Sequence, residues 1–410
     1  MAIHPRRVKT LIVLLLTGML WLQALLAWNA REQLRQGYSD FATLYGAGTI
    51  VREGLGRQLY DERTQFRVQR GFAPDVLIRQ GAFPYMHAPF EAAVFVPFSL
   101  LSYFHAYLLW NLINLVVLCS VPWVLRPYLG ILRGGPPLLW VLVAAAFFPI
   151  FIAFLQGQDI IFLLLFFTLT FISLKNGREF AAGAWLGLGL FRFHLVIPLL
   201  LVLVLRRRGK AVLGFSAVAL ALGLISVAVV GWKAMAGYPA YVWRVENVLG
   251  AVSADMPSLR GFLDSMIGIS FAPGFNMVVV ALTSIALVIF AASFWKPANS
   301  DRQFDLCFSL CVTISVMVGY HAFIYDLSLL LLPLLILANR FREIRQADGY
   351  TRLALLVPAG LLFLSPLQAM LVLRSGRVCL LVPVLLVWIW GMARLLAADN
   401  PSSAPLPIRA

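Results

Sequence analysis

Asp40 is the residue of this sequence best suited to act as a base. It stands in the segment Tyr38-Ser39-Asp40-Phe41, just beyond the first long apolar run, where the chain is expected to leave a membrane. A carboxylate at such a boundary can take a proton from an attacking hydroxyl group. The competing interpretation is that Asp40 caps the helix after it, which would stabilise that helix by about 1 kcal/mol.

Cations and other polar groups recur at the ends or in the middle of later apolar runs. Arg192 interrupts the run 181–205, where a buried cation needs a partner, either Asp159 or a bound phosphate. Arg260 follows a proline in a loop and can bind a phosphate bidentately or anchor lipid headgroups. His321 stands at a span junction and can donate to a phosphate or a sugar. The other candidates for substrate binding are Tyr45, Tyr60, Tyr85, His87, Gln158, Asp159 and Ser258.

Two groups of candidates have simpler interpretations. The three tyrosines can stack on a sugar ring, but tyrosines also gather at membrane interfaces. Asp61 precedes a helical run and is expected to cap it. No metal site is expected, because the acidic residues do not pair at Asp-x-Asp spacing.

The composition defines the elements that must position these residues. Of the 410 residues, 61% are hydrophobic and 12% are charged, and the apolar runs approach the length that crosses about 30 Å of hydrocarbon. The sequence therefore predicts a single all-α polytopic membrane domain over residues 1–410, with about 11 to 13 transmembrane helices. The net charge of +15 comes mainly from short loops between spans, which is the positive-inside pattern and argues against a nucleic-acid partner.

The expected loops divide the chain as follows. Residues 30–86 form a first outer loop with short interfacial helices, residues 232–274 a second outer loop, and residues 398–410 a disordered cytoplasmic tail. Spans are expected at about 9–28, 89–102, 104–124, 137–155, 160–174, 211–231, 275–295, 304–320, 324–339, 352–372 and 377–397.

The run 181–205 leaves two topologies open. It is either one span whose Arg192 faces a polar cavity, or two half-length helices that meet at Arg192 and leave on the same side. The second topology puts 175–178 and 206–210 in the cytoplasm, which the positive-inside rule favours, but counting spans from the N-terminus then puts 126–133 outside.

The sequence contains no phosphate-cradling Gly-rich loop, no His-Glu-x-x-His and no Gly-x-Ser-x-Gly. Chemistry on soluble nucleotides is therefore disfavoured. One carboxylate and several cations beside a bilayer suit an acceptor hydroxyl that attacks a lipid-linked phosphate ester.

A series of short motifs over residues 38–340 resembles glycosyltransferase family 87, formerly DUF2029. The motifs are Asp40-Phe41 with Tyr45, Gly56-Arg57-Gln58-Leu59-Tyr60-Asp61, Phe83-Pro84-Tyr85 with Pro89, Gly157-Gln158-Asp159 and Met256-Pro257-Ser258-Leu259-Arg260-Gly261. The chain differs from the family at three places. The family often has Tyr-Pro-Pro where this chain has Met86-His87-Ala88-Pro89, Asn in place of Asp159, and Lys in place of Arg192.

The resemblance implies a GT-C membrane fold and an inverting hexosyltransferase that uses a polyprenyl-phosphate sugar, for which the family suggests mannose. Asp40 would be the general base, and neither a nucleotide nor a metal cofactor is implied. The acceptor would be a glycolipid or a cell-envelope glycan, and the enzyme would lie among the lipids of the bacterial inner membrane with its active site on the periplasmic side.

Two other functions remain open at this stage. A flippase or transporter of lipid-linked glycans would use Arg192 and Asp159 to line its path, but it predicts matched broken helices in both halves, and only one broken run is evident. A ligase that transfers a whole polymer would share the same fold and chemistry.

Overall fold

The computed structural model describes residues 5–76, 83–248, 256–267, 273–296, 300–364, 366–367 and 380–398. Within these ranges the chain forms helices and turns and no strand, which confirms the all-α prediction. Six helices are long and apolar enough to cross a membrane, or seven if the bent pair α6 (Pro137–Ala146) and α7 (Phe148–Gln156) counts as one crossing. The chain is therefore an all-α polytopic membrane protein. Of the expected tail, residues 399–410 lie outside the described ranges.

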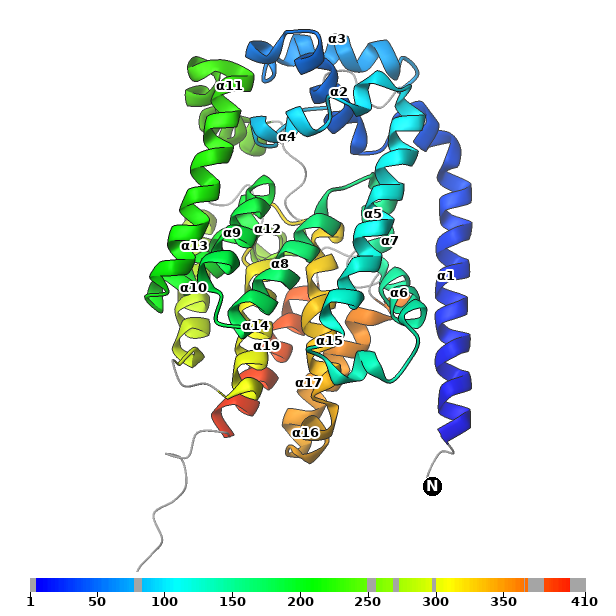
Figure 1. Ribbon diagram of the computed structural model, residues 1–410, viewed down its shortest axis with the longest axis vertical. Coiled ribbons are helices and arrows are strands. Elements are labelled where there is room, and N and C mark those ends of the chain that lie inside the picture. Colours follow the sequence, from blue (N-terminus) through cyan, green and yellow to red (C-terminus); the bar gives the residue numbers. More distant parts are fainter. Residues whose placement is uncertain are drawn as a thin grey trace, which may run out of the picture.

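The crossing helices form a bundle with α1 at its edge (Figure 1). Five of the six long helical stretches are α1 (Pro5–Gln36), α5 (Tyr103–Leu125), α11 (Gly209–Val248), α13 (Pro273–Phe294) and α19 (Leu381–Ala398). The sixth, Glu179–Leu205, meets the length and composition criteria but folds back on itself. Shorter members are α8 (Ile160–Lys175), α14 (Asp301–Met317), α15 (Leu331–Asn339) after the 3-10 helix η6 (Ile324–Leu330), and α17 (Gly349–Phe363) after α16 (Phe341–Gln346). The 11 to 13 spans expected from the sequence included these shorter helices, and they also included the run 89–102, which does not cross.

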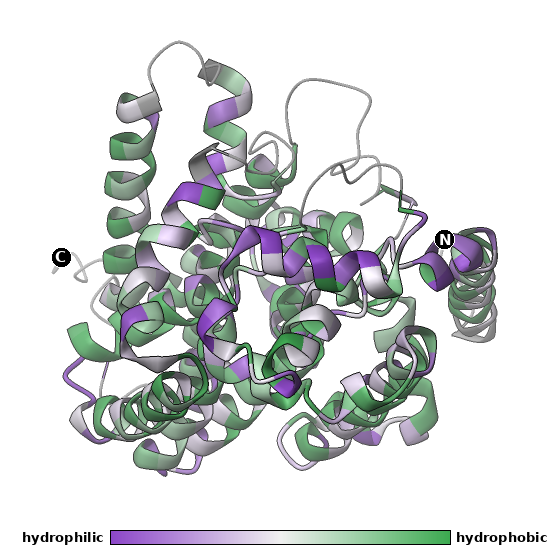
Figure 2. Ribbon diagram, turned by 90° about the horizontal axis from the view of Figure 1, so that it is seen from above, coloured by the Kyte–Doolittle hydropathy of each residue, from purple (hydrophilic) through white to green (hydrophobic). Residues whose placement is uncertain are grey.

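A layer of short helices covers one end of the bundle (Figure 1). It contains α2 (Phe41–Arg52), η1 (Gly56–Gln58), α3 (Glu62–Phe72), α4 (Pro89–Val94) and η2 (Phe98–Leu100). As expected, Asp61 caps α3, since its Oδ2 accepts a hydrogen bond from the Thr64 backbone N–H at 2.9 Å. Figure 2 views this layer from above and shows hydrophilic residues along the helical segment that crosses it. Helix α11 reaches the layer by a kink at Gly231, where φ is +80°, so the expected loop 232–274 begins as a helix.

The run 89–102 belongs to this layer, so its prediction as a membrane span is wrong. It forms α4, of six residues, and η2, of three, which are too short to cross. Helix α2 packs closely on its middle, because a Cβ on Gly48 would lie 2.4 Å from the Phe95 carbonyl oxygen. Burial between helices selects the same apolar residues as a lipid environment, and a short run does not distinguish the two.

The run 181–205 folds back on itself. It forms α9 (Glu179–Leu188), η4 (Gly189–Arg192) and α10 (Phe193–Leu205). Arg208 Nη1 donates to Glu179 Oε1 at 2.6 Å, so the two ends of the segment lie together. A straight helix of this length would separate them by about 40 Å. Of the two topologies left open, the structure has the pair of half-length helices that meet at Arg192.

The loops rich in basic residues lie at the opposite end of the bundle from the layer. The Ile131 backbone N–H donates to Asn339 Oδ1 at 3.0 Å, and Asp305 accepts from Lys175 and Arg340, each at 2.6 Å. The segment 126–133 therefore lies at the same end as 175–178 and 340–352. The conflict in counting spans disappears because 89–102 does not cross.

Candidate functional site

A cavity of about 1180 Å³ lies where the layer of short helices meets the bundle. Its lining comes from five segments far apart in the sequence, 83–87, 152–158, 191–194, 238–246 and 320–325, together with Asp40 and Thr43. Aromatic and aliphatic side chains make up much of the wall, including Phe193, Trp243 and Ile324. The cavity thus combines an apolar surface with a few polar groups, as small-molecule sites do.

Asp40 lies on the wall of this cavity at the start of α2. It occupies the N-cap position, but its side chain makes no capping hydrogen bond. Instead Gln158 Nε2 donates to Asp40 Oδ2 at 2.7 Å, and the Asp40 backbone N–H donates to Gln156 Oε1 at 3.0 Å. The capping interpretation of this side chain is therefore wrong. Gln158 holds the carboxylate, and Gln156 holds the backbone of the same residue.

Gln158 connects Asp40 to the buried Arg192, since its Oε1 accepts a hydrogen bond from Arg192 Nη2. The guanidinium, in a side chain that is 4% exposed, places Nε and Nη2 each 2.8 Å from Asp159 Oδ1. Its Nη1 lies 3.5 Å from Asp326 Oδ1, and the Tyr325 ring is 5.1 Å away. Of the two partners considered for Arg192, the structure has Asp159.

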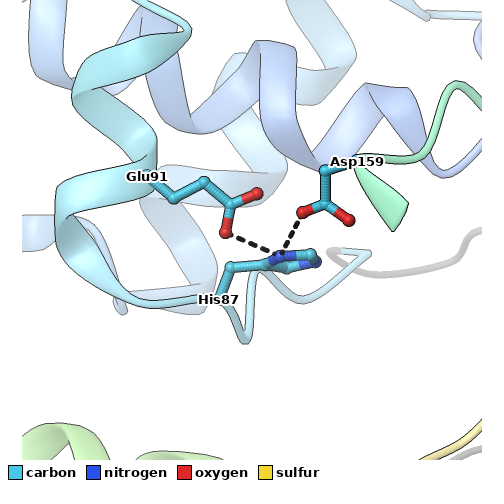
Figure 3. A group of neighbouring side chains, drawn as sticks. All are labelled: His87, Glu91 and Asp159. Atoms are coloured by element: carbon cyan, nitrogen blue, oxygen red, sulfur yellow. Dashed lines mark hydrogen bonds and ion pairs between the residues drawn. The ribbon is translucent and has the colours of Figure 1, made fainter. Parts of the chain in front are cut away.

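Three side chains converge next to this ion pair, from the loop before α4, from α4 and from the turn before α8 (Figure 3). His87 Nδ1 lies 2.9 Å from Glu91 Oε2 and 3.7 Å from Asp159 Oδ2. Burial, and next the charge of Arg192, lower the pKa of His87 to about 4, so its imidazole is neutral at pH 7. Burial and then the neighbouring Asp159 raise the pKa of Glu91 well above its usual range. These are the described residues whose donor atoms could hold a metal ion.

The opposite part of the wall is built around Glu246 from the upper part of α11. His321 Nδ1 is in contact with Glu246 Oε1, and the His194 and His321 rings lie 6.2 Å apart. Arg260 lies one layer behind the wall, with Nη1 3.5 Å from Glu246 Oε1 and its guanidinium stacked 4.1 Å from the Tyr320 ring. Arg260 and His321 thus lie together, as expected from the topology. Ser258 is fully buried, and its Oγ accepts from the Gly261 backbone N–H at 3.5 Å near the start of α12 (Leu259–Ile267).

The three tyrosines expected to stack on a sugar lie in the packing of the layer, behind the cavity wall. The Tyr45 hydroxyl donates to the Leu101 carbonyl at 2.8 Å. The Tyr60 hydroxyl donates to the His87 carbonyl at 2.8 Å, and the Tyr85 ring stacks on the His87 ring at 5.4 Å. Tyr60 and Tyr85 therefore orient His87. The tyrosines on the wall are Tyr238, Tyr320 and Tyr325.

Sequence reasoning missed two carboxylates of the site. Glu91 lies within a run interpreted as a span, although its position four residues after His87 was a signal that the two side chains could meet. Glu246 lies in a segment interpreted as a loop, and nothing in its spacing pointed to His321. Asp326, five residues after His321, was likewise not connected to Arg192.

These features define a class of protein: a helical membrane protein with a large, mainly apolar cavity and a carboxylate on its wall. Comparison with protein families matches residues 85–319, more than half of the chain, to glycosyltransferase family 87. The chain belongs to this family and is a membrane glycosyltransferase. No curated protein and no solved structure matches it. The matched region contains Gln158, Asp159 and Arg192, while Asp40 lies outside it.

Proposed function

We propose that the protein transfers a sugar from a polyprenyl-phosphate donor to the hydroxyl group of a glycolipid or cell-envelope glycan, with inversion at the anomeric carbon. The observation that carries the proposal is the position of the Asp40 carboxylate on the cavity wall. The carboxylate accepts a hydrogen bond from Gln158 and does not cap α2. Mannose is the sugar suggested by the family resemblance.

In the proposed reaction the acceptor oxygen forms a bond to the anomeric carbon. The bond from that carbon to the phosphate oxygen breaks, and its electron pair leaves with the polyprenyl phosphate. The hydroxyl proton passes to Asp40, which therefore acts as general base. In this mechanism Arg192, which lies on the same wall and also pairs with Asp159 and Asp326, stabilises the negative charge that develops on the departing phosphate.

The apolar part of the cavity suits a lipid-linked substrate. Val242, Trp243 and Ile324 offer a surface for isoprenoid chains, and a soluble nucleotide donor would gain little from it. The basic loops at the opposite end favour a cytoplasmic location for that end, by the positive-inside rule. The cavity would then open near the periplasmic side of a bacterial inner membrane.

Replacing the base tests the proposal. Purified Asp40→Asn protein in proteoliposomes, given radiolabelled polyprenyl-phosphate mannose and acceptor lipid, is expected to lose transfer by about a hundredfold or more, the usual range for a general base. The matched control is Asp61→Asn, the same change at the next helix start, where the carboxylate caps α3 outside the cavity.

Asp61→Asn is expected to retain transfer. Full transfer by Asp40→Asn would falsify the assigned mechanism. Parallel reactions with glucose- and galactose-linked donors test the sugar, and a clear preference for one of them over the mannose donor would contradict the choice of mannose while leaving the role of Asp40 intact.

A further inference from the structure

The charges around the cavity do not suit an anionic ligand by themselves. Among the described residues, five carboxylates line the wall or bond directly to it: Asp40, Glu91, Asp159, Glu246 and Asp326. Two guanidinium groups, Arg192 and Arg260, face them. Glu91 is neutral, because its pKa is raised well above its usual range, but the other four carboxylates still outnumber the two guanidinium groups. An excess of negative charge in a cavity of low polarity repels a phosphate. A cation bound among the carboxylates would remove this conflict.

We propose that His87, Glu91 and Asp159 form a binding site for one divalent metal ion of the zinc or manganese type. One donor atom from each residue lies within 4.8 Å of the other two (Figure 3). A tetrahedral ion with bonds of about 2.0–2.1 Å holds its ligand atoms about 3.3–3.4 Å apart. The two distances from His87 Nδ1, 2.9 and 3.7 Å, bracket this value, so small shifts would complete the site.

The carboxylates retain buried oxygens with which to bind an ion. Asp159 Oδ2 and Glu91 Oε1 are buried without a hydrogen-bond partner, and the two side chains are 5% and 6% exposed. Asp159 gives only its other oxygen, Oδ1, to Arg192. Unpaired buried oxygens of this kind are costly, and either an ion or a hydrogen bond between Glu91 and Asp159 satisfies them.

The histidine is held in place for coordination. The Tyr85 ring stacks on its ring, and the Tyr60 hydroxyl fixes its backbone carbonyl. Such orientation of a ligand by its surroundings is typical of metal sites. His87 also lines the cavity, so the ion would lie at the wall with a side open to water or substrate. Imidazole favours zinc, and carboxylates accommodate manganese. Calcium and magnesium prefer ligand sets made of oxygens alone.

A proton is the competing occupant. It would be shared between Glu91, His87 and Asp159, and a metal ion would replace it, because ligands bind in their deprotonated form. The two occupants predict opposite results when Glu91 is made neutral. If a metal ion is the occupant, Glu91→Gln removes a ligand and abolishes the site. If a proton is the occupant, the glutamine only imitates a carboxyl group that is already protonated.

The test is the metal content of the full chain purified in detergent, depleted with a chelator and reloaded with Zn²⁺ or Mn²⁺. About one ion per chain is expected by elemental mass spectrometry for the wild type. Glu91→Gln and His87→Gln are expected to bind the ion more than about a hundredfold more weakly, beyond the effect of losing an outer-shell partner. The matched control, Glu246→Gln, changes a carboxylate of the same cavity outside the cluster and should keep the ion.

A wild-type protein that binds neither ion, or a Glu91→Gln protein that binds as well as the wild type, overturns the proposal. A second measurement covers the case in which the variants do not fold: the melting temperature of the wild type should rise with added Zn²⁺ or Mn²⁺. An unchanged melting temperature with both ions would also overturn the proposed site.

The role of the ion in offsetting the carboxylates near the donor phosphate rests on the proposed function. Depletion is expected to raise KM for the donor. The two proposals remain separable, because Asp40→Asn should bind the ion normally while losing transfer.

Discussion

Gln158 joins Asp40 and Arg192, two of the charged groups of the cavity wall. Its amide nitrogen donates to Asp40 and its amide oxygen accepts from Arg192, so only one orientation of the amide satisfies both neighbours. A glutamine is suited to this position because it carries one donor and one acceptor on the same rigid plane. Gln158 thus places a neutral amide between the Asp40 carboxylate and the Arg192 guanidinium.

Gln158→Ala is expected to reduce kcat about 10- to 100-fold and to leave the chain folded. A hydrogen bond to a charged group contributes about 1.5–3 kcal/mol, which corresponds to this range of rates. Steady-state kinetics with the polyprenyl-phosphate donor measure the effect. Gln23→Ala, at a buried glutamine of α1 that bonds to the Ala146 carbonyl away from the cavity, should keep kcat. Equal losses in both variants would show that Gln158 has no specific role.

At the scale of elements, breaks between helices bring the site residues together. The turn between α7 and α8 presents Gln158 and Asp159, and η4 presents Arg192 where α9 and α10 meet. Gly157 makes the first break possible, with φ at +63° and no room for a side chain, since a Cβ would lie 2.8 Å from the Cβ of Phe41. Phe41 directly follows the catalytic candidate Asp40.

Gly157→Ala is therefore expected to disturb both stability and transfer. The left-handed backbone costs about 1–2 kcal/mol with a side chain present, and the overlap with Phe41 adds about 1–3 kcal/mol. Gly177→Ala is a matched control at the other end of α8, where φ is +70° and nothing lies within 4 Å of the added Cβ. Thermal unfolding and kcat should show the larger loss for Gly157→Ala, and equal losses would contradict this explanation.

Much of this arrangement could be predicted from local sequence, and the rest depends on distant contacts. Asp40, Gln158 and Arg192 stood out because polar groups are costly next to long apolar runs. Glu91 did not, since a short apolar helix buried between other helices has the same composition as a span. The meeting of His87 with Asp159 joins residues 72 positions apart, and no local pattern reports such a contact.

At the scale of the whole molecule, the two ends differ in chemistry. One end carries the layer of short helices and the cavity, and the other gathers the basic loops around the buried Asp305. The fold-back at Arg192 is essential to this asymmetry, because it returns the chain to the basic end after only half a crossing. This arrangement does not support the flippase interpretation that was considered from the sequence.

The fold-back predicts a definite pattern of side accessibility. In a background without the native cysteines, cysteines introduced at Arg178 and Lys210 should react with a membrane-impermeant maleimide from the same side of the membrane. A cysteine at Arg63, in the layer, should react from the other side. All three positions are exposed. Labelling of 178 and 210 from opposite sides would mean that the segment between them is a single span.

The burial of α14 has a consequence for the cell as well as for the fold. Every residue from Asp305 to Met317 is buried, so the helix that runs from the basic end toward the cavity is a dry column of protein. An ion or proton moving along it would have to shed its hydration shell, at a cost of many kcal/mol. The wide, mainly apolar cavity can therefore open to one side of an energised membrane while the buried protein beyond it insulates the two sides from each other, which preserves the voltage across the bilayer.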